Sequence, residues 1–250
     1  MSAAQTSYPV EKMVFRKTNQ HKGRYISVTP DNSTNRHLSY GRIILDRDAP
    51  SIAFNNGNQE TGLICLSGHA TLRTAGESFE VGQYDSIYIP RDSRIEVSTG
   101  AAVDFAEFSS DVEKKYPLQF VSYAELSKDP TLKFSTGTPG QARHLNICLG
   151  KNVQAGRLLA GFTISEPGNW TSWPPHEHAA MLEEMYVYFD MPEPAFAVQL
   201  VYNDMQQPEV ASKAKHYGVR SVPAIAVDGK LAGCCAGRGP DEHVLRSALA

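Results

Sequence analysis

Residues 62–73 read GLICLSGHATLR, in which two short strand-like runs flank a Ser-Gly turn. The same rhythm continues on both sides of this stretch. Alternating or β-branched runs at 42–45, 85–89 and 94–98 are separated by Gly, Asn and Pro residues, which favour turns. Short strands at this spacing are typical of a β-sandwich or a small barrel and not of βαβ units. We therefore predict a β module in the first half of the chain.

The strand pattern resumes after a polar connection at 111–140, in which we expect one short helix. Runs at 143–149, 157–165, 185–189 and 196–202 are strand-like. Two stretches of similar character indicate a duplicated β module.

Apart from that short helix, helical patterns are confined to the last part of the chain. Residues 209–217 and 240–249 predict helices, and 221–227 predict a strand that precedes a turn at Asp228-Gly229. An α–β–β–α order after an all-β body marks a change of structure, so we place a domain boundary at about residue 205.

Composition argues against several classes of function. The 250 residues carry 24 basic and 27 acidic side chains, a net charge of −3, so no basic excess is present to neutralise nucleic-acid phosphates. No apolar run reaches the roughly 18 residues that span a bilayer, and residues 1–17 lack the apolar centre of a secretory signal. The four dispersed cysteines fit reduced thiols. We expect a cytoplasmic protein that binds neither nucleic acid nor membrane.

Residues 173–178 read WPPHEH and carry the strongest chemical signal. In an extended chain, His176 and His178 point to the same side, because side chains two apart share a face. A carboxylate a few residues further on can supply a third ligand. Two imidazoles and one carboxylate suit a divalent transition metal (Zn, Mn, Fe or Ni) and leave positions open for substrate. The alternative is a solvated loop that carries two histidines and no metal.

Two neighbouring glutamates compete for the third ligand position. Glu184 shares a strand face with Tyr186 and Tyr188, a polar-tipped set that suits a substrate cavity. Glu183 shares its face with three apolar side chains, a set that suits packing against protein. The alternation of side chains between the two faces of the strand therefore favours Glu184 as the ligand.

Other polar residues carry weaker signals. We expect His21, His37 and His69 on the surface. His144 either lines a cavity or lies on a strand surface. Its neighbour Arg143 is a candidate to hold a substrate carboxylate through two parallel hydrogen bonds, with a plain surface role as the alternative.

Three blocks, 168–178, 182–186 and 196–204, resemble in this order the bacterial sugar-acid isomerases of the cupin superfamily. The similarity is strongest to the 5-deoxy-glucuronate isomerase family, with 5-keto-4-deoxyuronate isomerase as its cousin. Residues 82–90, GQYDSIYIP, are similar to the metal-free first module of that family.

This resemblance implies a mainly β fold of two tandem cupin barrels, a metal-free one at 1–115 and an incomplete, metal-carrying one at 116–205. It implies a metal on His176, His178 and Glu184, and conversion of 5-deoxy-D-glucuronate to 2-deoxy-5-keto-D-gluconate in inositol catabolism. Tyr186 and Tyr188 become candidates for orienting the small sugar-acid substrate. By analogy with such cupins, a homo-oligomer is expected.

The chain departs from the family after residue 205. Such isomerases use a fourth ligand, a histidine in a late strand, and no matching segment is present here. His216 falls near the required distance but within a predicted helix, so we do not assign it. Residues 206–250 instead resemble the carboxy-terminal half of a thioredoxin-like domain, which would make a short α/β fragment. The missing strands predict a weakly stable second module with impaired metal retention.

Three functions remain open from the sequence. The first is a metal-dependent isomerase, and the second is a non-catalytic module that binds a sugar acid. The third is a thiol adaptor that acts through Cys234 and Cys235. No Cys-x-x-Cys is present, and adjacent cysteines in a strand point to opposite faces, so a structural role is expected for this pair.

Overall fold

The computed structural model describes residues 10–171, 182–194, 196–197, 199, 212, 215–216, 226–227 and 230–231. The chain divides into two compact units. Unit 1 comprises 1–135, 144–164 and 178–185, and unit 2 comprises 136–143, 165–177 and 186–250.

The larger sheet of unit 1 has six strands in the order β1-β2-β9-β4-β7-β10, and all neighbours are antiparallel. Its register brings together residues far apart in the sequence, because Ile43 pairs with Phe105 and Leu63 pairs with Glu107. The strands are β1 (Gly23–Val28), β2 (Leu38–Leu45), β4 (Gln59–Gly68), β7 (Ser86–Ile89), β9 (Val103–Asp111) and β10 (Gln119–Val121).

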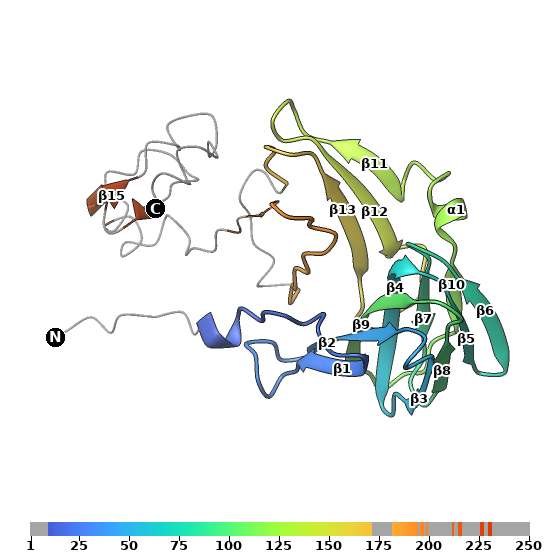
Figure 1. The fold of residues 1–250 in the computed structure, drawn as a ribbon. Helices are drawn as coiled ribbons and strands as arrows, with labels where there is room; N and C mark the ends of the chain where they lie inside the picture. The colour runs from blue at the N-terminus through green and yellow to red at the C-terminus, as the bar shows by residue number, and fades with distance from the viewer. Residues whose placement is uncertain are drawn as a thin grey trace. The chain divides into compact units, whose positions relative to one another are not determined.

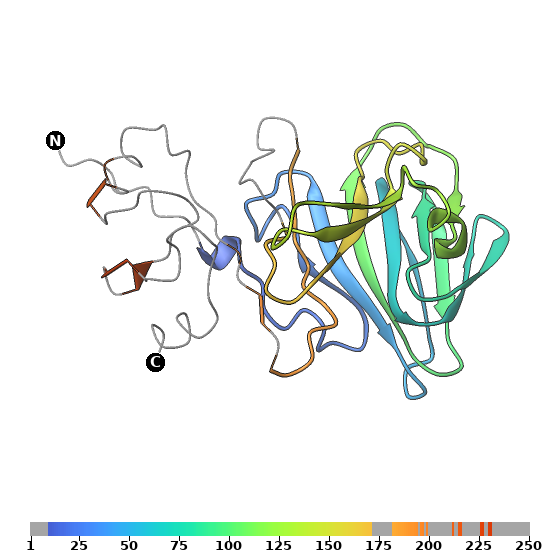
Figure 2. The same cartoon turned by 90° about the horizontal axis from the view of Figure 1, so that it is seen from above.

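A second sheet of four strands faces the first, in the order β3-β8-β5-β6. Figure 1 shows both sheets in one β module, and Figure 2 shows their strands from above, across a shared interior. The four strands are β3 (Ser51–Asn55), β5 (Ala70–Thr74), β6 (Glu77–Val81) and β8 (Arg94–Ser98). Among the described residues no ladder joins the two sheets, so they form an open sandwich and not the closed barrel that we expected.

The apolar core lies between these two sheets. Alternate residues of each strand point inward, as Ile43 and Leu45 do on β2 and as Val103 and Phe105 do on β9. The second sheet contributes an equally buried set that includes Leu72. Burial of one face of each sheet accounts for the alternating pattern from which the strands were predicted.

The outer face of the six-stranded sheet is also covered. A Cβ atom added at Gly62 would clash with the ring of Phe108 and would lie 2.9 Å from Leu149 Cδ1. Leu149 belongs to a three-stranded sheet with the order β11-β12-β13. Its strands are β11 (Lys133–Thr136), β12 (Arg143–Leu149) and β13 (Ala160–Ser165).

A buried carboxylate fastens this covering layer to the larger sheet. Glu60 is 0% exposed, and its oxygens accept hydrogen bonds from the backbone N–H groups of Gly156 (2.7 Å), Arg157 (2.6 Å) and Leu158 (3.1 Å). The Tyr88 hydroxyl donates a further bond of 2.7 Å. Burial, together with this bond to Glu60, raises the pKa of Tyr88, so the hydroxyl keeps its proton.

The sequence predicted several elements well. Strands at 94–98 and 143–149 have the predicted bounds, and the short helix α1 (Tyr123–Leu126) lies in the polar connection, as expected. A single 3₁₀ turn, η1 (Val10–Lys12), near the start of the chain was not predicted. The strands at 42–45 and 62–66 are observed but longer. The strand predicted at 185–189 is wrong, because the described residues 182–190 pair with no other strand.

The carboxy-terminal predictions are tested only in part. Strands β14 (Ala226–Val227) and β15 (Lys230–Leu231) pair on either side of the predicted turn at 228–229. Ser212, Lys215 and His216 are helical, within the helix predicted at 209–217. The predicted helix at 240–249, most of 196–202 and both Cys234 and Cys235 lie outside the described residues, and the domain boundaries near 115 and 205 stay predictions.

We predict that Glu60→Gln lowers the free energy of unfolding by about 2–4 kcal/mol, because an amide nitrogen cannot accept the bonds that the carboxylate accepts. Urea unfolding followed by far-ultraviolet circular dichroism, which reports on the β-sheets, measures the change. Glu113→Gln is the matched control, because this exposed glutamate makes no side-chain hydrogen bond among the described residues. Equal stability of the two variants would show that the Glu60 bonds do not hold the layers together.

Candidate functional site

The segment around Glu184 is the part of the predicted metal site that the structure describes. His176 and His178 lie outside the described residues. Along 182–190, exposure alternates residue by residue: Glu184, Tyr186 and Tyr188 are exposed, whereas Glu183 and its apolar neighbours are half-buried. The chain therefore runs extended here, although it joins no sheet.

Glu183 is held by the protein itself. Its two carboxylate oxygens accept hydrogen bonds from the backbone N–H groups of Arg36 (2.5 Å), His37 (2.9 Å) and Leu38 (3.1 Å). Partial burial opposes ionisation, but these backbone bonds outweigh it and hold the pKa of Glu183 below its usual range. Glu183 thus fixes residues 182–185 to the turn that precedes β2.

Glu184 differs from its neighbour Glu183 in its bonding. Among the described residues its carboxylate makes no hydrogen bond or ion pair, in contrast with the three bonds of Glu183. A carboxylate that the protein leaves unpaired, a few residues after two histidines, fits the donor set of a divalent transition metal. The described residues alone contain no group of three or more His, Cys, Asp or Glu side chains that could hold a metal ion.

The remaining predicted site residues belong to unit 2. Tyr188 donates a 3.0 Å hydrogen bond to Gln199 Oε1, and burial raises its pKa. Tyr186 is 47% exposed. Arg143 is half-buried, and its Nη1 donates to the carbonyl oxygen of Thr171, which leaves other N–H donors of the guanidinium for a carboxylate. The roles predicted for these three residues stay predictions.

The other described histidines have the environments that the sequence predicted. His21, His37 and His69 are exposed, and His21 stacks on Tyr25 with ring centroids 4.0 Å apart. His144 is half-buried on β12, with Nδ1 2.7 Å from the Ser135 hydroxyl. His216 is exposed on its helical segment.

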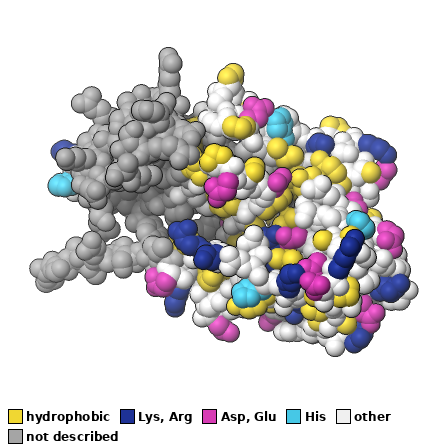
Figure 3. All heavy atoms as spheres, in the orientation of Figure 1, with side chains coloured by type: hydrophobic (Ala, Val, Ile, Leu, Met, Phe, Trp, Pro, Cys, Tyr) yellow, Lys and Arg dark blue, Asp and Glu magenta, His cyan; other side chains and the backbone are white. Residues whose placement is uncertain are grey.

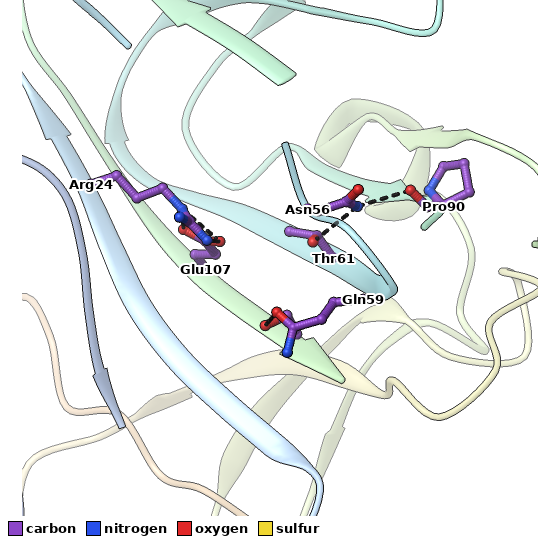
Figure 4. A network of polar contacts seen from close by, with 7 residues as sticks. Arg24, Asn56, Gln59, Thr61, Pro90 and Glu107 are labelled. Atoms are coloured by element: carbon purple, nitrogen blue, oxygen red, sulfur yellow. Dashed lines mark hydrogen bonds and ion pairs between the residues drawn. The ribbon is translucent and has the colours of Figure 1, made fainter. Parts of the chain in front are cut away.

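Polar residues inside the first module are the feature that the sequence reasoning missed. Glu107 is 0% exposed, and Arg24 donates to it from Nε (2.8 Å) and Nη2 (2.7 Å), as Figure 4 shows. The same guanidinium lies 4.0 Å from the centroid of the Phe54 ring. The carboxylate is met by two N–H groups and the guanidinium by an aromatic face, so both charges have partners and the pair is neutral as a whole. The sequence signal for this buried pair is Glu107 itself, a charged residue at a position of β9 whose side chain points into the core.

The described cysteines have no accessible thiolate. Cys65 and Cys148 are buried and free, and burial raises the pKa of each thiol to about 12. Both are therefore protonated at neutral pH and poor nucleophiles. Across the parts of the chain that the structure describes, no helix is long and apolar enough to cross a bilayer.

Comparison with known proteins gives relatives over most of the chain. A model of the KduI/IolB family matches residues 13–243. The chain is 28% identical over 215 residues to 5-deoxy-glucuronate isomerase of Lacticaseibacillus casei, with 77% of each chain covered. It is 26% identical over 174 residues to 4-deoxy-L-threo-5-hexosulose-uronate ketol-isomerase of Opitutus terrae, which covers 67% of this chain and 58% of that protein.

A solved structure supports the fold. The crystal structure of an IolB-like protein from Salmonella typhimurium LT2 superposes with a TM-score of 0.55 at 20% sequence identity. The superposition covers 62% of this chain and 60% of that chain. The mainly β, cupin-like architecture expected from the sequence is therefore confirmed, whereas a thioredoxin-like tail is not.

We predict that Glu183→Gln loosens the segment that carries Glu184, because an amide cannot accept all three backbone bonds. Hydrogen–deuterium exchange should rise in peptides that span 36–38 and 182–185. Glu184→Gln is the matched control and should leave this exchange unchanged. The reverse pattern would mean that Glu184, and not Glu183, is the anchored residue.

We also predict that Cys65 and Cys148 resist alkylation by iodoacetamide at pH 8 in the folded protein. With each pKa at about 12, the thiolate fraction is on the order of 10⁻⁴. Mass spectrometry of tryptic peptides measures the labelling, and the urea-unfolded chain is the positive control. Rapid labelling of either residue before unfolding would contradict this.

Proposed function

The chain belongs to the KduI/IolB family, and from this premise we propose that it is a metal-dependent isomerase of a deoxy-uronic acid. The proposed reaction is the conversion of 5-deoxy-D-glucuronate to 2-deoxy-5-keto-D-gluconate, an aldose–ketose isomerisation in inositol catabolism. The observation that carries the proposal is the family match over 13–243, which includes both the first β module and the His176 segment.

The names of the relatives support this class of reaction. The relatives from Lacticaseibacillus casei and Opitutus terrae are both named isomerases of a uronic acid, the second one a ketol-isomerase. Such a reaction moves a carbonyl group to the neighbouring carbon and needs proton transfer between the two positions. No external oxidant or reductant is consumed, so a nucleotide cofactor is not required.

The proposed metal ligands are His176, His178 and Glu184. A divalent transition metal bound there supplies polarisation of the substrate carbonyl and of the adjacent hydroxyl. The contrast between Glu183, which is bonded to backbone, and Glu184, which is not, supports Glu184 as the carboxylate ligand.

Three side chains would then handle the substrate. Tyr186 and Tyr188 would orient it as hydrogen-bond donors, with Tyr188 exchanging its bond to Gln199 for one to the substrate. The raised pKa of Tyr188 keeps its hydroxyl protonated at neutral pH. Arg143 would hold the carboxylate of the sugar acid with the N–H groups that its bond to Thr171 leaves unused.

The alternative is a module that binds the sugar acid without turning it over. It is favoured by one feature of the sequence, the lack of a late-strand histidine that could serve as the fourth ligand. A metal-loaded protein that binds the substrate and gives no product would support this alternative over the isomerase.

We predict that Glu184→Gln lowers both bound metal and turnover of 5-deoxy-D-glucuronate by more than about 100-fold, since even indirect partners of metal ligands account for about 10–100-fold. Plasma mass spectrometry of the purified protein gives the metal content, and Glu113→Gln should match the unmodified chain. The proposal fails if the unmodified protein contains no transition metal and takes up none from Mn²⁺ or Zn²⁺ solutions.

A further inference from the structure

The interior of the first β module changes from apolar to polar along the strands of its larger sheet. On β9, Val103 and Phe105 belong to the core, and Glu107 and Ser109 share their face. On β4, Leu63 is followed on the same face, toward the start of the strand, by Thr61 and Gln59. We call this region, formed by Gln59, Thr61, Glu107 and Ser109, the polar end.

The buried side chains of the polar end find their hydrogen-bond partners within the protein. Glu107 is neutralised by Arg24, and the Ser109 hydroxyl donates a 3.1 Å bond to Gln59 Oε1. Asn56 Nδ2 bonds the Pro90 carbonyl (2.8 Å) and Thr61 Oγ1 (3.3 Å), as Figure 4 shows. This layer therefore forms a rigid polar floor without unbalanced charge.

A cleft of about 420 Å³ reaches this floor at Gln59. Ser39 and Gln59 line its base, and Ser39 is 4% exposed. The strand register brings its walls together, because Gln59 pairs with Asp111 and Ser39 pairs with Ser109. The volume falls in the range of small-molecule sites, about 300–1,000 Å³.

The walls of the cleft carry charges of both signs. Arg36 and His37 supply donors, and Asp31 and Asp111 supply acceptors. Among the described residues, the side chains of Arg36, Asp31 and Asp111 form no ion pair or hydrogen bond, so their bonding capacity is unused. On the face of the module that Figure 3 shows, basic and acidic side chains are likewise interspersed and do not gather by sign.

We propose that this cleft is a second ligand site, which takes a small polyhydroxylated carboxylate, the chemical class of a sugar acid. Arg36 binds the carboxylate through its planar pair of N–H groups. Asp31 and Asp111 accept from ligand hydroxyls, and Ser39 and the free amide N–H₂ of Gln59 bond the groups that face the floor.

The mixed charges select this class over its competitors. Two carboxylates on the wall repel a doubly charged phosphate about twice as strongly as a monoanion, and the hydroxyls of a polyhydroxylated monoanion can donate hydrogen bonds to them. A neutral sugar would leave the Arg36 guanidinium without an anionic partner. The cleft uses no residue of the His176 segment, so it would bind such a ligand whether or not the chain isomerises it.

Isothermal titration calorimetry with D-glucuronate tests the site on the full-length chain kept in EDTA, which removes any contribution from bound metal. We expect binding by the unmodified protein, a loss of at least about ten-fold in affinity for Arg36→Gln, and a smaller loss for Asp111→Asn. Arg73→Gln, which changes an exposed arginine of β5 without a side-chain bond among the described residues, should bind as the unmodified protein does.

Two further ligands and one further variant complete the test. Acetate, which lacks hydroxyls, and xylitol, which lacks a carboxylate, should each bind at least about ten-fold more weakly than D-glucuronate. Glu184→Gln should bind D-glucuronate normally, which separates this site from the proposed metal centre. The proposal is overturned if D-glucuronate gives no binding, if Arg36→Gln binds it unchanged, if acetate binds as tightly, or if only Glu184→Gln loses it.

Discussion

The two-residue repeat of the extended chain is the constraint on which the rest of this structure depends. On β9 it sends Phe105 into the apolar core and, two residues later, sends Glu107 into the same interior, where only a paired charge is tolerated. Arg24 supplies that pair. The same repeat points Glu183 and Glu184 to opposite sides of the chain after the histidine pair. The carboxylate of Glu183 accepts backbone hydrogen bonds, and that of Glu184 stays available for a metal.

Burial of both faces of the larger sheet follows from the same repeat. The inner face packs on the four-stranded sheet, and the outer face, which includes Gly62, packs on Leu149 of β12. A charged residue on either face must then find partners inside the protein. Glu60 does so with the backbone of 156–158, and this contact joins two parts of the chain that are nearly one hundred residues apart.

Much of the β architecture could be predicted because its signal is local. The runs at 94–98 and 143–149 alternate clearly and became strands with the predicted bounds. β6 was missed because its sequence ESFEV is mostly exposed and has few apolar residues to mark a strand. Residues 185–189 alternate as a strand does, yet a strand also needs a hydrogen-bonding neighbour, which no local pattern reveals. The bonds of Glu60 and Glu183 to distant backbone N–H groups have no local signal at all, although the parity of Glu183 and Glu184 did indicate which of them faces protein.

We infer that alternation assigns Glu183 to the protein and Glu184 to a metal. Crystals of protein loaded with Mn²⁺ or Zn²⁺, measured by anomalous diffraction at the absorption edge of the metal, would locate the ion and its ligands. We expect one anomalous peak within about 2.0–2.3 Å of His176, His178 and Glu184, with Glu183 still bonded to the backbone of 36–38. A peak coordinated by Glu183, or no peak near the two histidines, would contradict it.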